Sequence, residues 1–266
     1  FLRIVSALLV VVITLMAFGM FALSTNEYEV LSRNAIASLL FYSNNYYAIH
    51  SSYFDPSSEL NFLLHTWSLS AEWQFYILYP LLVILIKKLR LPVGLALSAI
   101  FTISLTITLM RVTGTREDIF YLLPTRAWEM LAGGLVYMAS VRYKMPEWIK
   151  HCDGYGIALI VVAATILHSN GYWPSYSTFA PVLGASMVIL ANDQNSIFTS
   201  NRVAQWAGKI SYSVYLWHWP VVVAMRYYQI DFSAINIFIG VVSSFALGEL
   251  SYRIIESTLR KRARLI

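Results

Sequence analysis

Charged residues are scarce in this sequence: Asp, Glu, Lys and Arg make up 12% of its 266 residues, whereas a water-soluble domain has about 25%. Hydrophobic residues make up 58%, and the mean hydropathy is +0.60. A chain with so little charge cannot cover a folded surface with polar groups, and its hydrophobicity excludes a disordered chain. The composition therefore predicts an integral membrane protein.

Cysteine and several chemical motifs are also missing. The single cysteine, Cys152, excludes an internal disulfide bond and a metal site made of several cysteines. The sequence contains no HExxH, Walker loop, GxGxxG or GxSxG, so metalloproteases, ATPases and dinucleotide-binding enzymes have no support. We expect no metal site and no bound cofactor. We also expect no nucleic-acid partner, because a net charge of +5 is ordinary for a membrane protein with basic cytoplasmic loops.

Long apolar segments recur along the chain. A helix rises about 1.5 Å per residue, so about 20 mostly apolar residues are needed to cross a bilayer. We predict an all-α fold, a polytopic transmembrane domain of about eight spans, with residues 1–266 in one domain. The predicted spans are residues 4–23, 73–86, 92–110, 120–141, 155–168, 178–191, 210–225 and 232–252.

Lys and Arg lie mainly on one side of these spans, as the positive-inside rule requires. Fourteen of the nineteen are on that side, four are on the other, and Arg126 lies within a span. Both ends of the chain are therefore predicted to be cytoplasmic, in the inner (plasma) membrane, with basic residues 260–264 binding anionic lipid. The fourteen are Arg3, Lys87, Lys88, Arg90, Arg142, Lys144, Lys150, Arg202, Lys209, Arg253, Arg260, Lys261, Arg262 and Arg264; the four are Arg33, Arg111, Arg116 and Arg226.

Residues 30–50 are apolar enough to suggest a further span. A crossing there would place the basic group of Lys87, Lys88 and Arg90 outside, against the positive-inside rule. We therefore predict that residues 26–66 stay on the outer side. Residues 30–50 would form a re-entrant or interfacial helix, with tyrosines at headgroup level.

Polar side chains near the start of the second span form one helical stripe. His65, Ser68 and Glu72 stand at i, i+3 and i+7 in LLHTWSLSAEWQFY. An imidazole and a carboxylate on one face can act as a general base, because the carboxylate orients the ring. The same pair can instead form a structural hydrogen bond at the end of the helix. The spacing favours neither interpretation.

Charged residues inside a span cost about 2.5–3.5 kcal/mol each, so those that persist face protein or a wet cavity. Arg126 and Glu129 stand at i, i+3 in LLPTRAWEMLAGG and can simply neutralise each other. An Arg with spare donors can also hold a phosphate or a developing oxyanion. We expect a ligand role for Arg126.

A third stripe lies in KISYSVYLWHWPVV, where Ser211, Tyr215 and His218 stand at i, i+4 and i+7. Pro220 removes a helical hydrogen bond, which frees a backbone carbonyl near Leu216 as an additional acceptor. A single intramembrane His often forms only a helix-to-helix hydrogen bond. Because the whole stripe is polar, we expect His218 to line a cavity.

Four segments resemble, in order, successive motifs of the acyltransferase-3 family of membrane acyltransferases. They are LLHTWSLSAEWQFY, FYLLPTRAWEMLAGG, ISYSVYLWHWP and SYRIIESTLR. The pattern is most similar to the branch in which an extracytoplasmic SGNH domain follows the membrane domain. The resemblance implies a ten-helix enzyme that moves an acyl group, commonly acetyl from acetyl-CoA, to hydroxyls of envelope carbohydrate such as lipopolysaccharide O-antigen.

The family's first helix, which carries a basic residue and a key His, has no counterpart here. We therefore expect a fragment that lacks two helices and is inactive alone, and ten minus two agrees with the eight predicted spans. This sequence departs from the family pattern at Trp73, where a second acid follows the one matched by Glu72, and at Thr258, where the family has Pro.

The resemblance and the polar residues together predict a membrane O-acyltransferase. His65, Ser68 and Glu72 would lie near the outer mouth of a chamber, with the acyl-CoA donor and the carbohydrate acceptor as partners. The interior would be lined by Arg126, Glu129 and His218. The alternative is a secondary transporter, which also buries ionisable groups but often shows inverted repeats and paired broken helices. Neither feature is visible in the sequence.

Overall fold

The computed structural model describes residues 2–50, 59–112, 120–143, 146–166, 178–193 and 196–257. These residues form helices joined by turns and contain no strand, which confirms the predicted all-α membrane fold. Five helical segments of the described chain are long and apolar enough to cross a membrane, so the count of eight spans stays a prediction. They are Ile4–Ala22, Thr66–Lys88, Val93–Met110, Glu147–Ile166 and Ala234–Glu256.

The chain packs as two units, one made of Phe1–Ala71 with Trp206–Ile266 and the other of Glu72–Gln205. We call them the outer-segment unit and the central unit, after the parts of the sequence that form them. Helices α4 (Thr66–Lys88) and α9 (Arg202–Tyr227) continue from one unit into the other. The prediction of one domain over residues 1–266 stays a prediction.

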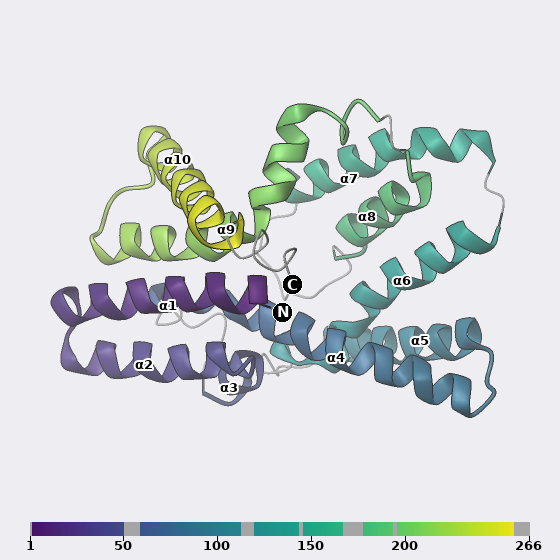
Figure 1. The fold of residues 1–266 in the computed structure, drawn as a ribbon, viewed down its shortest axis with the longest axis horizontal. Helices are drawn as coiled ribbons and strands as arrows, with labels where there is room; N and C mark the ends of the chain where they lie inside the picture. Colours follow the sequence, from purple (N-terminus) through teal and green to yellow (C-terminus); the bar gives the residue numbers. More distant parts are fainter. Residues whose placement is uncertain are drawn as a thin grey trace. The chain divides into compact units, whose positions relative to one another are not determined.

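The outer-segment unit begins with two helices that lie side by side, α1 (Leu2–Ala22) and α2 (Thr25–Leu39) (Figure 1). Ser24 caps α2: its hydroxyl accepts from the Glu27 N–H, and the Glu27 carboxylate accepts from the Ser24 N–H at 2.8 Å. This reciprocal capping box fixes the sharp turn between the helices. The remaining elements are α3 (Ser43–His50), the first turn of α4, α9 from Trp206, α10 (Ala234–Ser251) and the π-helix η6 (Tyr252–Glu256).

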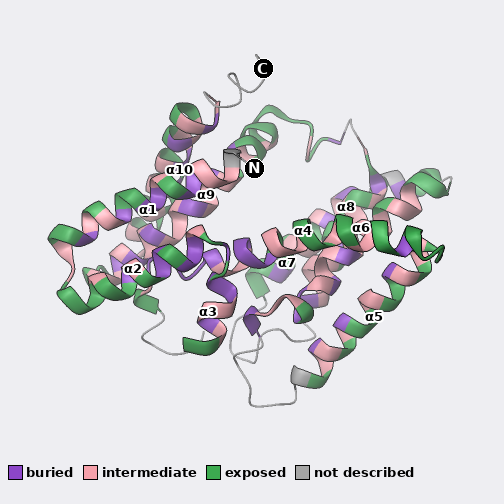
Figure 2. Cartoon of the chain, turned by 60° about the horizontal axis from the view of Figure 1, so that its bottom comes forward, coloured by how far each residue is buried: buried purple, intermediate pink, exposed green. Residues whose placement is uncertain are grey.

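Helix α1 has the surface expected of a membrane helix that packs against neighbouring helices on one face. Buried positions alternate along it with exposed apolar ones (Figure 2), and Ala7, Leu8 and Val11 are fully buried while Phe21 is 91% exposed. An apolar side chain left outside the protein core needs lipid rather than water around it. Helices α2 and α3 cover the predicted re-entrant region, and neither is among the candidate spans; the side on which they lie stays a prediction.

The central unit contains the rest of α4, α5, α6, α7 and α8. Ile86, Leu97 and Leu131 form a buried core between α4, α5 and α6. Helix α6 packs against both α5 and α8, and α8 packs against α7. The elements are α5 (Val93–Val112), η3 (Leu123–Thr125), α6 (Ala127–Arg142), η4 (Glu147–His151), α7 (Cys152–Ile166) and α8 (Phe179–Ala191).

Helices α7 and α8 approach each other at two glycines. A Cβ atom added to Gly156 would lie 2.5 Å from the Gly184 carbonyl oxygen, and one added to Gly184 would lie 2.6 Å from that of Gly156. Only glycine allows helix backbones to approach so closely. The predicted spans 155–168 and 178–191 fall on these helices; His168, at the end of the first, and the predicted lipid-binding residues 260–264 lie outside the described residues.

Candidate functional site

His65 is the centre of the polar group in the outer-segment unit. It ends a turn at residues 62–65, directly before α4. The residue is 7% exposed, and neither ring nitrogen has a hydrogen-bond partner within the described residues. Buried polar atoms are normally paired, so the two ring nitrogens of His65 are groups that can form hydrogen bonds with a bound molecule.

Tyr215 of α9 holds His65 in place. Its hydroxyl donates to the His65 backbone carbonyl at 2.5 Å and lies 2.6 Å from the Ser68 hydroxyl. The Tyr215 and His65 rings are in edge contact, with centroids 5.3 Å apart. The aromatic ring therefore packs on the imidazole while its hydroxyl fixes the turn that carries it.

His218 of α9 lies beside His65, and the expectation that it lines a cavity stays a prediction. The two imidazole centroids are 5.7 Å apart, and the rings are nearly perpendicular. His218 Nδ1 is 2.5 Å from the Tyr215 carbonyl oxygen, so that nitrogen carries the proton and donates. In the neutral ring, Nε2 then keeps the lone pair and can accept a hydrogen bond or a proton.

The carbonyl that Pro220 frees also contributes to this group. The Leu216 carbonyl, four residues before Pro220, interacts with His65, although the contact does not reach hydrogen-bond geometry. Burial, and secondly the charge of His218, lower the pKa of His65 to about 3, and Leu216 opposes this shift. His65 is therefore a neutral imidazole at pH 7.

Buried amide and hydroxyl groups fix the turn before α4, and the sequence analysis did not identify them. Asn61 Oδ1 accepts from the Leu63 N–H and from Asn34 of α2, each at 3.0 Å. The Asn61 carbonyl oxygen accepts from the Trp219 indole at 2.8 Å. In the sequence, such a network is marked only by short polar residues beside an apolar motif.

A second chain of buried hydroxyls joins α2, α3 and α4 through Ser38, Thr66, Ser43 and Ser70.

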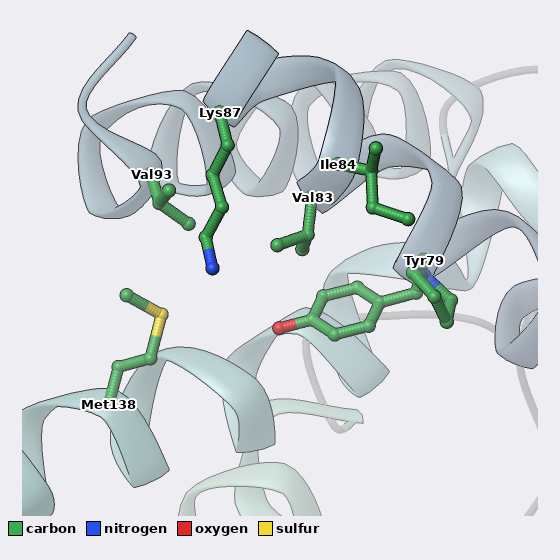
Figure 3. Close-up of a pocket in the computed structure, with 7 residues that line it drawn as sticks. Tyr79, Val83, Ile84, Lys87, Val93 and Met138 are labelled. Atoms are coloured by element: carbon green, nitrogen blue, oxygen red, sulfur yellow. The ribbon is translucent and has the colours of Figure 1, made fainter. Parts of the chain in front are cut away.

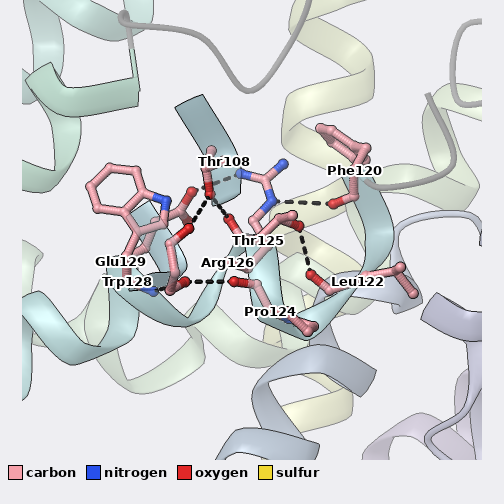
Figure 4. Close-up of polar contacts among 9 residues, drawn as sticks. Thr108, Phe120, Leu122, Pro124, Thr125, Arg126, Trp128 and Glu129 are labelled. Atoms are coloured by element: carbon pink, nitrogen blue, oxygen red, sulfur yellow. Dashed lines mark hydrogen bonds and ion pairs between the residues drawn. The ribbon is translucent and has the colours of Figure 1, made fainter. Parts of the chain in front are cut away.

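The central unit contains the second polar group, around Arg126 (Figure 4). Arg126 is 7% exposed and forms an ion pair with Glu129 at 2.8 Å. Its Nε donates to the Phe120 carbonyl at 3.3 Å, and the guanidinium carbon lies 4.4 Å from the centre of the Phe120 ring. The predicted i, i+3 pairing is thus confirmed, and an aromatic face supports the same cation.

Helix α5 supports the segment that carries Arg126. The Ser104 hydroxyl donates to the Pro124 carbonyl at 2.6 Å and accepts from the Trp128 N–H at 3.0 Å. One turn later, the Thr108 hydroxyl donates to the Thr125 carbonyl at 2.7 Å. These bonds satisfy backbone groups around the short helix η3 and fix the start of α6.

Arg126 and Glu129 open onto a cavity of about 300 Å³ between α6 and α8. Its walls include the small residues Gly133, Ala185 and Ser186. Such a cavity holds a small group beside the guanidinium, whose donors match a carbonyl, carboxylate or phosphate oxygen.

The six predicted site residues fall into both units. His65, Ser68 and His218 come together in the outer-segment unit, and Arg126 and Glu129 come together in the central unit. Glu72 is exposed on α4, and within the described part of the chain His65 forms no hydrogen bond to a carboxylate. Among the described residues, no group of three or more His, Cys, Asp or Glu could hold a metal ion.

Comparison with known proteins gives a family match and several relatives. A family model described as an acyltransferase domain (acyltransferase-3) matches residues 1–253. A putative membrane-bound transacylase, BcsY of Komagataeibacter xylinus, is 29% identical over 96% of this chain and 66% of its own length. The peptidoglycan O-acetyltransferase OatA of Listeria monocytogenes is 27% identical over 98% of this chain and 45% of its own length.

The O-acetyltransferase OatA of Staphylococcus aureus is 25% identical over 87% of this chain and 42% of its own length. The chain therefore spans less than half the length of both acetyltransferases. No solved structure gives a significant match.

Proposed function

Because this chain belongs to the acyltransferase-3 family, we propose that its protein is a membrane O-acyltransferase. It would move an acyl group, acetyl first of all, from acyl-CoA to a hydroxyl of envelope carbohydrate. The observation that supports this chemistry best is His65: a buried, neutral imidazole whose nitrogens have no partner in the described chain, held against a second histidine by Tyr215. A hydroxyl group of an acceptor would supply the missing hydrogen bond.

The reaction joins the acceptor oxygen to the thioester carbonyl carbon and breaks the carbon–sulfur bond. The acceptor proton leaves with a base, and the departing thiolate ends as the CoA thiol. A pKa of about 3 makes His65 a weak base. In the proposal His65 therefore accepts a hydrogen bond and orients the hydroxyl, while a different group acts as the principal base.

The other site residues have supporting roles in the proposal. Ser68 positions His65 through Tyr215, and His218 offers Nε2 to the same acceptor. Arg126 stabilises the negative charge on the thioester oxygen, with Glu129 orienting its guanidinium. Glu72, exposed on α4, is the carboxylate proposed for the outer mouth. A cavity of about 300 Å³ beside Arg126 favours a short acyl group.

Peptidoglycan is the first acceptor to test, since the name of one relative gives it as the substrate of that protein. Lipopolysaccharide O-antigen is the second. The proposal places the protein in the inner membrane with both chain ends cytoplasmic, and includes an SGNH domain as a partner in the full protein. A secondary transporter remains the alternative from a different class.

Purified full-length protein in proteoliposomes separates these functions. With radiolabelled acetyl-CoA and a peptidoglycan or O-antigen acceptor, we expect free CoA thiol and an alkali-labile acetyl ester on carbohydrate. Transport of the substrate without thioester cleavage would establish the transporter instead.

His65→Gln tests the supporting observation in the same assay. We expect turnover to fall at least tenfold, because the acceptor hydroxyl loses its imidazole partner. His50→Gln is the matched control: His50 is exposed on α3, where its Nδ1 donates to the Tyr46 carbonyl and its ring stacks on that of Tyr46. Equal turnover for both variants would return His65 to a structural role.

A further inference from the structure

A second cavity in the central unit lies away from Arg126. It is an open groove of about 530 Å³ formed by α4, the start of α5 and the end of α6. Val83, Ile84, Val93 and Met138 give it apolar walls (Figure 3). Figure 3 shows the Lys87 ammonium and the hydroxyl end of Tyr79 directed into the space between these walls.

The polar side chains of this groove are donors. Lys87 has three N–H donors and no acceptor, and the Tyr79 hydroxyl can donate one hydrogen bond. Within the described chain, neither Lys87 nor the Tyr79 hydroxyl has a hydrogen-bond or ion-pair partner. Gly134 leaves room for the hydroxyl, which would lie 3.4 Å from a Cβ atom at that position. A ligand must therefore present acceptor oxygens, and a negative charge at Lys87.

The groove also requires an apolar part in its ligand. Tyr79 and Lys87 are eight residues apart on α4, which places them about 12 Å apart along the helix axis. The side chains between them are aliphatic. A free phosphate ion would satisfy Lys87 but would leave this apolar length uncovered, whereas an amphiphile with an anionic head and a hydrocarbon tail fits both parts.

We propose that this groove binds one anionic phospholipid, with its phosphate at Lys87, an ester oxygen that accepts from the Tyr79 hydroxyl, and an acyl chain along the aliphatic side chains of the groove. Lys87, Lys88 and Arg90 form a basic cluster at the end of α4, on the predicted cytoplasmic side, where anionic lipids concentrate. Basic pockets between transmembrane helices are the usual sites for such headgroups. The site does not depend on acyl transfer.

Native mass spectrometry in mixtures of phosphatidylcholine and phosphatidylglycerol tests the proposal. Purified wild-type protein retains one phosphatidylglycerol, and its Tm rises by roughly 3 °C when that lipid is present. Lys87→Gln loses both effects. Lys88→Gln removes the same charge from the neighbouring position but leaves the groove intact, so it retains the lipid and the Tm rise.

Tyr79→Phe is a second test variant, and it should fold normally because it removes one hydroxyl and leaves the ring stacked on Phe75. It should weaken lipid retention about fivefold, the effect of one lost hydrogen bond. Equal losses in Lys87→Gln and Lys88→Gln would show general surface attraction and overturn the site. Displacement of the lipid by acetyl-CoA would also overturn it, because the groove would then belong to the acyl donor.

Discussion

The two polar groups of this protein are built in opposite ways. In the outer-segment unit, Tyr215 reaches a partner 150 residues away when it bonds the His65 carbonyl. In the central unit, Arg126 bonds Glu129 three residues away and Phe120 six residues away. The first group exists only because distant helices pack together, whereas the second is largely present in one segment of chain.

The two groups also differ in how far the protein satisfies them. Arg126 is held by a carboxylate, a carbonyl and an aromatic ring, so the cation is stable before any ligand arrives. His65 is buried, and neither of its ring nitrogens has a partner among the residues that the structure describes, which costs free energy in the unliganded protein. The comparison indicates a preformed electrostatic site in the central unit and a site in the outer-segment unit that a ligand completes.

The largest loss of turnover that distinguishes the two polar groups is expected from Arg126→Ala. Removing one preorganised donor from a site that stabilises negative charge lowers turnover about 10²–10³-fold. Acetyl transfer by the purified full-length protein measures the loss, with Tm as the check on folding. Arg142→Ala is the control, because Arg142 is exposed at the end of α6, the helix that Arg126 directly precedes; wild-type turnover in Arg126→Ala would remove Arg126 from the mechanism.

The next effect addresses the wall of the Arg126 cavity. Gly156→Ala brings a methyl group against the Gly184 carbonyl, and overpacking of this kind costs about 3 kcal/mol. The variant should lower Tm and, because α8 lines the cavity, reduce acetyl transfer. An added Cβ at Gly208 of α9 has no atom of the described residues within 4 Å, so Gly208→Ala should keep the wild-type Tm; a Gly156→Ala variant that also did so would contradict the close packing of α7 and α8.

The smallest effect concerns the pH dependence of the outer-segment unit. His65 has a pKa of about 3 in the folded protein against an ordinary value of 6.5, so between these values the unfolded chain binds more protons. The contribution of neutral His65 to the free energy of unfolding is therefore present above pH 6.5 and is lost as the pH decreases toward 3. At pH 5 the loss is about 2 kcal/mol. Tm measured from pH 7 to pH 5 should decline less in His65→Gln than in the wild type, and identical slopes would show that His65 is not buried as a neutral ring.

Local periodicity predicted the all-helical fold and the α9 stripe because both depend on near neighbours, but His65 lies in the turn before α4 and Glu72 is exposed, so the first stripe is not one helical face. The i, i+3 spacing of Arg126 and Glu129 led directly to their ion pair. The i, i+4 and i+7 stripe on α9 placed Tyr215 and His218 on one side, and Pro220 indicated the free carbonyl near Leu216. The contacts of Asn61 and Thr66 could not be predicted in this way, since short polar residues near the start of a helix usually act only as helix caps.

The sequence by itself determined an all-helical membrane domain, the order of its motifs, its acyltransferase family and the local Arg126 pair, because hydropathy and helical spacing act over a few residues. Only the tertiary structure decided that Tyr215 holds His65, that Asn61 joins α2 to α9, and that α4, α5 and α6 leave a groove at Lys87. Contacts between residues far apart in the chain depend on how helices pack, and packing is set by the shapes of many side chains together.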